Sequence, residues 1–247
     1  MAKKARSVSN TAPLPRLLLF NDLPTQNSLV RYNAEISGVL RPGEDRRVLR
    51  IRGGEKEKPA ILNAVDEVFR RLSYRLVSDS PPDSLKSLAG IWLEGSDIAE
   101  LRKGISSMSD LSAAIFNHGV PYIGVLAGAE LAGLSASDNL ETLAVIDAHV
   151  RTGLPTIEGQ IADSYRLLSG TTRKTVFALL PKSVARLDSH GVDVETRVID
   201  GTVLICRPGN YVGFGIGNRI DFGLGDHRAE KPHSITAEKG YRGFVPV

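Results

Sequence analysis

Short apolar runs and helical patterns alternate along most of this chain. Arg16–Phe20 (RLLLF) is an apolar run that ends at Asn21-Asp22, and residues 46–53 (RRVLRIRG) alternate between apolar and polar positions before a pair of glycines. Both patterns are typical of strands that end at turn residues. A helix is expected from Lys58, because apolar residues recur there at the spacing of one helix face: Ile61, Leu62, Val65, Val68, Phe69 and Leu72.

The same alternation continues through the middle of the chain. The predicted order is strand 75–78, helix 81–88, strand 89–97, helices 98–106 and 111–118, strand 120–125 and a helix that begins near Ala127. Repetition of short apolar strands and helices predicts an α/β fold with a parallel sheet covered by helices on both faces. In such sheets the functional loops lie at the carboxyl ends of the strands.

The pattern changes beyond Val176, where short strands and turns follow one another as TVFALL, SVARLDSHG, VETRVIDG and TVLICRPG. This predicts a β-rich C-terminal segment, built as a hairpin or meander on the sheet edge. From Asn210 the chain is Gly-rich and weakly periodic, and we expect little regular structure there. The predicted divisions are a disordered basic tail (1–15), one α/β domain (16–212) and a Gly-rich C-terminal extension (213–247).

Charge and composition narrow the function classes. The first 16 residues carry four basic side chains and no acidic one, which exceeds the formal net charge of +3 of all 247 residues. The rest of the chain is therefore close to neutral, which argues against a nucleic-acid-binding face. With no apolar run of about 18 residues and no secretory leader, we expect no membrane span and a cytoplasmic protein. The single cysteine, Cys206, excludes an intramolecular disulfide and fits a small buried hydrophobe.

Residues 121–132 (PYIGVLAGAELA) have the form of a nucleophile elbow: an apolar strand, a tight turn flanked by Gly124 and Gly128, and a small-residue helix. The middle position of such an elbow carries the Ser or Cys that attacks the substrate. Leu126 occupies it here, and leucine has no lone pair with which to attack. Loss of the nucleophile costs about 10⁶-fold in kcat in subtilisin, so the sequence predicts a nucleophile-deficient elbow.

Four stretches, in order, resemble the peptidase E and cyanophycinase group of Ser hydrolases. GIWLEGSDIAEL is similar to its strand and GGD/N turn, PYIGVLAGAELAG to its GxSAGA elbow, and VIDAHV to the D-x-H segment that supplies the catalytic histidine. The closing β segment, from VFALLPKSVARLD through GTVLICRPG, is the fourth. The resemblance covers roughly residues 16–208. It implies a class I glutamine amidotransferase-like fold, with three α/β/α layers and a mainly parallel central sheet.

Carried over to this sequence, the resemblance places the nucleophile at Leu126 and the catalytic histidine at His149. The family's acidic position falls at about Pro181-Lys182, so it too is lost. We therefore expect a non-catalytic binding or assembly protein, and a homodimer, because relatives often pair. The alternative is a hydrolase of Asp-containing or β-Asp-linked dipeptides with altered catalytic residues. The nearby serines are not in an elbow: Ser96, Ser135 and Ser137.

A ligand site is expected around the elbow, because its glycines can keep backbone amides directed into a pocket. The residues predicted to line it are Glu94, Gly95, Ser96, Asp97, Ala127, Gly128 and Glu130. With Asp147 nearby, several acids at one cleft favour a cationic, arginine-like or Asp/Arg-containing small ligand. A metal beside His149 is a further possibility from the same donors, but we expect neither a metal nor a cofactor.

Simpler roles compete with each of these assignments. Asp97 precedes an apolar-periodic run and fits the N-cap of the following helix. Glu130 fits a local cap or salt bridge, and His149 fits a structural histidine. The basic tail offers a nucleic-acid contact as a third class of function, which predicts binding that is lost with salt and with deletion of residues 1–15.

Overall fold

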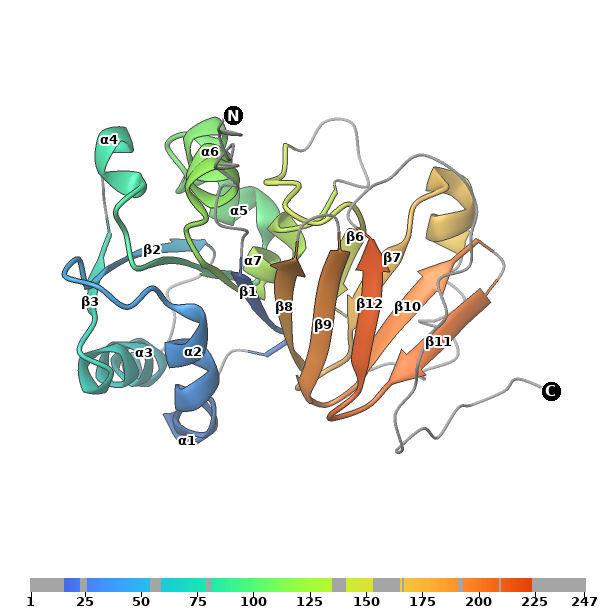
Figure 1. Ribbon diagram of the computed structural model, residues 1–247, viewed down its shortest axis with the longest axis horizontal. Coiled ribbons are helices and arrows are strands. Elements are labelled where there is room, and N and C mark those ends of the chain that lie inside the picture. The colour runs from blue at the N-terminus through green and yellow to red at the C-terminus, as the bar shows by residue number, and fades with distance from the viewer. Residues whose placement is uncertain are drawn as a thin grey trace, which may run out of the picture.

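The computed structural model describes residues 16–22, 26–53, 59–78, 81–134, 141–152, 165, 167–190, 193–208 and 210–223. An eight-stranded sheet forms the centre, with helices on both of its faces, and a four-stranded sheet lies beside it (Figure 1). The predicted α/β fold with a largely parallel central sheet is confirmed. The tail at 1–15 and the end of the chain at 224–247 lie outside the described residues.

The parallel half of the central sheet contains the five strands expected from the N-terminal pattern: β1 (Arg16–Phe20), β2 (Arg47–Gly53), β3 (Arg75–Val77), β4 (Gly90–Gly95) and β5 (Tyr122–Leu126). Their order is β3-β2-β4-β5-β1, and every neighbouring pair is parallel. All six residues of β4 are buried, as expected for its apolar run Ile91-Trp92-Leu93, and the charged residue Glu94 is buried with them. The carboxyl ends of these strands meet at one edge of the sheet.

One face of this sheet is covered by α1 (Gln26–Arg31), α2 (Asn33–Val39) and α3 (Pro59–Arg71). A hydrophobic cluster lies beneath them, and we call it the α3-face cluster; it includes Phe20, Ile36, Phe69, Trp92 and Val125. Phe69 meets Trp92 edge to face, with ring centroids 5.3 Å apart. The periodicity had not indicated α1 and α2, because six- and seven-residue helices expose too few apolar positions to show a repeat.

The opposite face carries α4 (Pro82–Leu85), α5 (Ile98–Lys103), α6 (Met108–His118) and α7 (Ala127–Leu131). The boundaries of α6 follow from capping. The Ser107 hydroxyl accepts a hydrogen bond from the Asp110 N–H, and Gly119 ends the helix with φ of 61°. A second hydrophobic cluster lies between these helices, the strands of the central sheet and the inner face of the second sheet. We call it the α7-face cluster; it includes Leu49, Leu111, Tyr122, Val150 and Phe177.

The C-terminal strands divide between the two sheets. β8 (Val184–His190), β9 (Asp193–Asp200) and β12 (Arg219–Gly223) extend the central sheet with antiparallel pairing. The second sheet has the order β11 (Asn210–Phe214), β10 (Val203–Arg207), β7 (Val176–Leu179) and β6 (His149–Thr152). The β-rich segment is thus more than an edge hairpin or meander.

The prediction of little regular structure from Asn210 onward is wrong for residues 210–223. β11 pairs with β10, and β12 pairs with β9. These ladders are made by main-chain groups, so they do not require the side-chain alternation that the sequence lacks. In the described part of the chain, no helix is both long and apolar enough to cross a bilayer.

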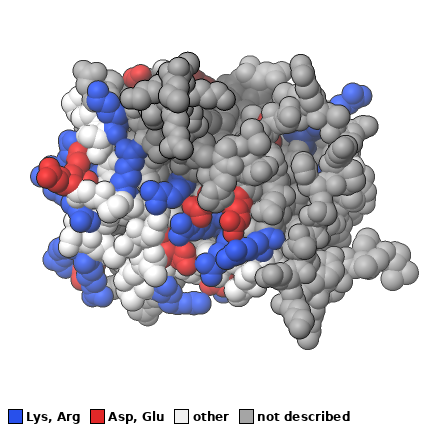
Figure 2. Space-filling view, in the orientation of Figure 1, with Lys and Arg blue, Asp and Glu red and all other residues white. Residues whose placement is uncertain are grey.

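Charged side chains of both signs are interspersed over the described part of the face shown in Figure 2. Several form ion pairs between elements distant in sequence: Arg31 of α1 pairs with Asp200 of β9 at 3.3 Å, and Arg186 of β8 pairs with Glu35 of α2 at 3.7 Å. Tyr32 donates a hydrogen bond of 2.6 Å to Asp200, and burial together with this bond raises the pKa of the Tyr32 phenol to about 12. These contacts attach α1 and α2 to the antiparallel half of the sheet.

Candidate functional site

The junction of β5 and α7 has the strand, turn and helix expected of the elbow. Leu126 ends β5 and precedes α7 with φ of 51° and ψ of −112°. Non-glycine residues seldom adopt positive φ, and for a bulky residue it signals strain, of about 1–3 kcal/mol. The backbone at Leu126 therefore has the sharp, strained form in which an elbow presents its nucleophile.

Close packing around the turn explains its glycines. A Cβ atom at Gly124 would lie 2.7 Å from the Gly128 carbonyl oxygen, and one at Gly128 would lie 2.0 Å from the Leu93 carbonyl oxygen. Both distances are shorter than van der Waals contact, so α7 can approach β4 and β5 only if these positions lack side chains. Tyr122, fully buried, donates its hydroxyl to the Gly128 carbonyl and braces the turn from within the core.

The side chain of Leu126 is half-buried and packs against the α3-face cluster. It offers no hydroxyl or thiol at the position where the elbow would present one. Gly95 lies beside it, in register on β4, and a Cβ at Gly95 would lie 2.4 Å from the Gly53 carbonyl oxygen. The elbow therefore keeps its backbone form while its central side chain is apolar.

Glu94 has its carboxylate fully buried on the α3 side of the sheet. It accepts a hydrogen bond from Arg50 Nε at 2.7 Å and from the Trp92 indole N–H at 2.5 Å. Arg50 also pairs with Asp66 of α3 at 3.1 Å. The negative charge of Glu94 is thus matched within the chain, which leaves it little capacity to bind an external cation.

The other predicted acids also have local partners. Asp97 is the N-cap of α5 and accepts a hydrogen bond of 2.9 Å from the Glu100 N–H, as the capping alternative proposed, while Ser96 beside it is exposed. Glu130 accepts hydrogen bonds of 2.8 Å from both the N–H and the hydroxyl of Thr152. Asp147 pairs with Lys174 at 2.9 Å. Each of these acids therefore has a partner within the chain.

His149 begins β6 and is 3% exposed. Its Nδ1 donates a hydrogen bond of 3.1 Å to the Leu134 carbonyl, and within the described part of the chain Nε2 has no partner. Burial lowers the pKa of the imidazole, an effect that the Leu134 hydrogen bond partly opposes. His149 is therefore a neutral ring near pH 7.

Strand register separates His149 from the elbow. Val150, the next residue of β6, joins the α7-face cluster, so His149 points to the other face of the second sheet, beside Val176. Leu126 packs into the α3-face cluster across the central sheet. The base-to-nucleophile contact that acyl transfer requires is not among the contacts of the described residues.

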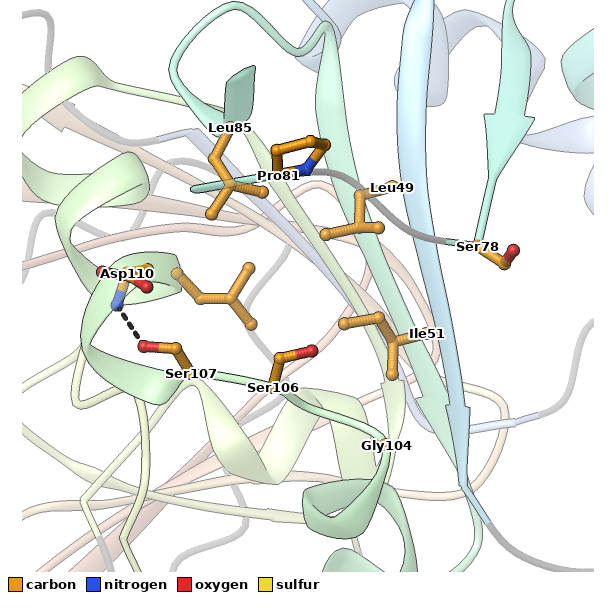
Figure 3. A pocket seen from close by; sticks show the side chains of 10 residues that line it. Leu49, Ile51, Ser78, Pro81, Leu85, Gly104, Ser106, Ser107 and Asp110 are labelled. Carbon is orange, nitrogen blue, oxygen red and sulfur yellow. Dashed lines mark hydrogen bonds between the residues drawn. The ribbon is translucent and has the colours of Figure 1, made fainter. Parts of the chain in front are cut away.

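A cavity that the sequence did not indicate lies between β2, α4 and the start of α6 (Figure 3). Ser106, Ser107 and Asp110 contribute polar groups to its wall. The only sequence signal was the Ser107-x-x-Asp110 spacing, which marks a helix start. In the part of the chain that the structure describes, no cluster of His, Cys, Asp or Glu side chains is suited to a metal ion.

Comparison with known proteins finds a solved structure of similar fold. No family model matches the chain, and no curated protein matches it. Among solved structures, the chain is similar to a peptidase from an acI-B1 actinobacterium, with a TM-score of 0.61 and 16% sequence identity. The match covers 85% of this chain and 97% of that peptidase. The chain therefore has a peptidase-like fold.

Proposed function

We propose that this chain is a non-catalytic relative of the peptidase E and cyanophycinase hydrolases that acts as a binding or assembly protein. The observation that carries the proposal is Leu126, an apolar residue in the strained backbone position of the nucleophile. Acyl transfer by this class of enzyme needs a hydroxyl or thiol there, with a base in contact. The described contacts of Leu126 and His149 supply neither.

The surroundings of the elbow support a structural role for its side chains. Glu94, Asp97 and Glu130 are engaged by Arg50, the start of α5 and Thr152, respectively. Leucine at position 126 adds apolar contact to the α3-face cluster. In this chain, the turn that would present a nucleophile instead connects β5 to α7 and packs an apolar side chain against the core.

The test is hydrolysis of Asp-Xaa and β-Asp-Arg dipeptides by the natural protein, with Leu126→Ala as the matched control and Leu126→Ser as the restored hydroxyl. We expect no turnover by the natural protein or by Leu126→Ala. Leu126→Ser is also expected to be inactive, because His149 points to the other face of the second sheet, beside Val176, and has no described contact with position 126. Turnover by Leu126→Ser alone would show a pocket that lacks only its nucleophile, and the natural protein would still be non-catalytic.

The alternative function is hydrolysis of Asp-containing or β-Asp-linked dipeptides by altered catalytic residues. The observation in its favour is His149, a buried ring whose Nε2 has no partner among the described residues. That alternative predicts turnover by the natural protein that survives Leu126→Ala and is lost in His149→Ala. Such a result would overturn the non-catalytic proposal.

A further inference from the structure

A cavity of about 280 Å³ lies on the α6 side of the central sheet, and it is partly open to solvent. Figure 3 shows Leu49 and Ile51 of β2 along one side, with Leu85 and Pro81 from the α4 region at another. An apolar cavity of about 150 Å³ is enough to hold benzene. The volume here therefore suits one small organic molecule with a compact apolar body.

Polar groups of this cavity gather at the start of α6. Ser106 is exposed, and the Ser107 hydroxyl accepts the Asp110 N–H at 3.2 Å, as the dashed line in Figure 3 shows. This capping contact fixes the backbone of Asp110 beside the cavity. Among the described residues that line the cavity, Asp110 is the only charged one.

The charge of Asp110 is unmatched within the described residues. The two basic residues of the preceding helix, α5, have other partners, because Arg102 pairs with Glu141 and Lys103 pairs with Glu100. No ion pair of Asp110 is found among the described residues. This differs from Glu94, whose carboxylate is matched by Arg50.

We propose that this cavity binds a small organic ammonium ion, a primary amine on a compact aliphatic or aromatic body. The apolar wall formed by Leu49, Ile51, Leu85 and Leu111 takes the body of the ligand, and its burial supplies affinity. The ammonium group donates to the Asp110 carboxylate and to the serine hydroxyls at the same end. A carboxylate or phosphate ligand is disfavoured, because it would lie against Asp110.

This site is independent of the inert elbow. None of the described residues that line the cavity belongs to α7, and Leu126 is not among them. Ammonium binding and dipeptide turnover are separate measurements, so the failure of either proposal is distinguishable from the failure of the other.

The test compares three molecules of similar shape by isothermal titration calorimetry: benzylamine, benzyl alcohol and benzoate. A hydrogen bond to a charged group contributes about 1.5–3 kcal/mol, so we expect benzylammonium to bind at least about tenfold more tightly than benzyl alcohol. Benzoate is expected to bind more weakly than either. Equal affinity for all three, or no binding of benzylammonium at millimolar concentration, would overturn the proposal.

Two variants locate the binding. Asp110→Asn keeps the size of the side chain and removes its charge, so the preference for benzylammonium over benzyl alcohol should disappear while the affinity for the alcohol stays the same. Asp22→Asn is the matched control, because Asp22 is exposed after β1 and does not line the cavity. It should leave all three affinities unchanged, and an equal effect of the two substitutions would contradict the site.

Ser106→Trp provides a second, steric test. Ser106 is exposed at the cavity wall, so an indole there can occupy the cavity without disturbing the buried core. We expect both benzylammonium and benzyl alcohol to lose binding in a variant whose thermal unfolding is unchanged. Full retention of binding in this folded variant would place the ligand elsewhere.

Discussion

The elbow and the cavity differ in nearly every respect, although α7, the helix of the elbow, lies on the same side of the central sheet as the cavity, whereas the Leu126 side chain packs on the other side. At the elbow the backbone is strained at Leu126 and so tightly packed that a Cβ at Gly128 would lie 2.0 Å from a carbonyl oxygen, yet the central side chain is inert. None of the described residues that line the cavity has a positive φ, and space of about 280 Å³ is left beside an acid and several hydroxyls. The elbow thus has the backbone geometry of a catalytic turn without a reactive side chain, and the cavity has polar side chains without a strained backbone.

Replacement of Arg50 should produce the largest change in the free energy of unfolding, because Glu94 depends on an ion pair in the core, whereas Asp110 has no ion-pair partner among the described residues. Arg50→Met leaves the fully buried Glu94 carboxylate without its cation. Breaking a buried pair in this way costs about 3–5 kcal/mol, measured as the free energy of unfolding in urea. Asp110→Asn should change that free energy by less than about 1 kcal/mol.

The matched control for this pair is the double variant Arg50→Met/Glu94→Gln, which removes the buried charge and keeps an oxygen that accepts the Trp92 indole N–H. With no unpaired charge left in the core, the double variant should recover most of the lost stability. If the double variant were no more stable than Arg50→Met, then burial of an unpaired charge would not be the cause.

Gly128→Ala should destabilise the protein by about 3 kcal/mol, because the added methyl group meets the Leu93 backbone and forces α7 away from β4. Gly43→Ala is the control, since a Cβ there has no atom within 4 Å. Chemical denaturation of both variants measures the difference. A Gly128→Ala protein as stable as Gly43→Ala would mean that the elbow is not tightly packed.

Leu126→Gly should be more stable than Leu126→Ala by about 1 kcal/mol. Both substitutions remove the same half-buried contact, but only glycine relieves the strain of φ at 51°. In ordinary helices and strands the order is the reverse, with glycine less stable than alanine. If alanine proves the more stable residue here as well, the strained elbow conformation at position 126 is refuted.

The smallest expected effect is the change of the unfolding free energy with pH that results from His149. Burial lowers the pKa of His149 in the folded protein, so the unfolded chain binds a proton more readily below about pH 6.5. Stability is therefore full above that value and falls as the pH drops toward the folded pKa. We expect the unfolding free energy of His149→Gln to change less between pH 7 and 5 than that of the natural protein.

The control for this titration is His118→Gln, at an exposed position near the end of α6. That variant should keep the slope of the natural protein. A flattened slope in His118→Gln and an unchanged one in His149→Gln would mean that the buried ring does not govern the pH dependence.

The sequence predicted the elements whose side-chain pattern is strong. β4, β5 and the turn between Gly124 and Gly128 were located because buried strands are continuously apolar and close helix packing requires small residues. β11 and β12 were missed, because main-chain pairing leaves little trace in a Gly-rich segment. Short helices such as α1 were missed for lack of a repeat.

Parts of the candidate site depend on contacts between segments distant in sequence, which pattern alone does not reveal. Glu94 was expected to face a ligand, but its partner Arg50 is 44 positions away and meets it only because β2 and β4 are neighbours. The cavity beside Asp110 was not predicted, because Leu49 and Leu85, which help to form it, come from separate elements. The position of Leu126 was predicted, because the strand, turn and helix of an elbow are consecutive.

The most direct test of the central claim is intact-mass analysis of the natural protein after incubation with a fluorophosphonate, which reacts covalently with activated serines. An active serine hydrolase in the same tube confirms that the reagent is competent. If the elbow is inert, the mass of this protein stays unchanged while the hydrolase is fully labelled. Stoichiometric labelling that maps to one serine of this chain would contradict the account and establish a working nucleophile outside position 126.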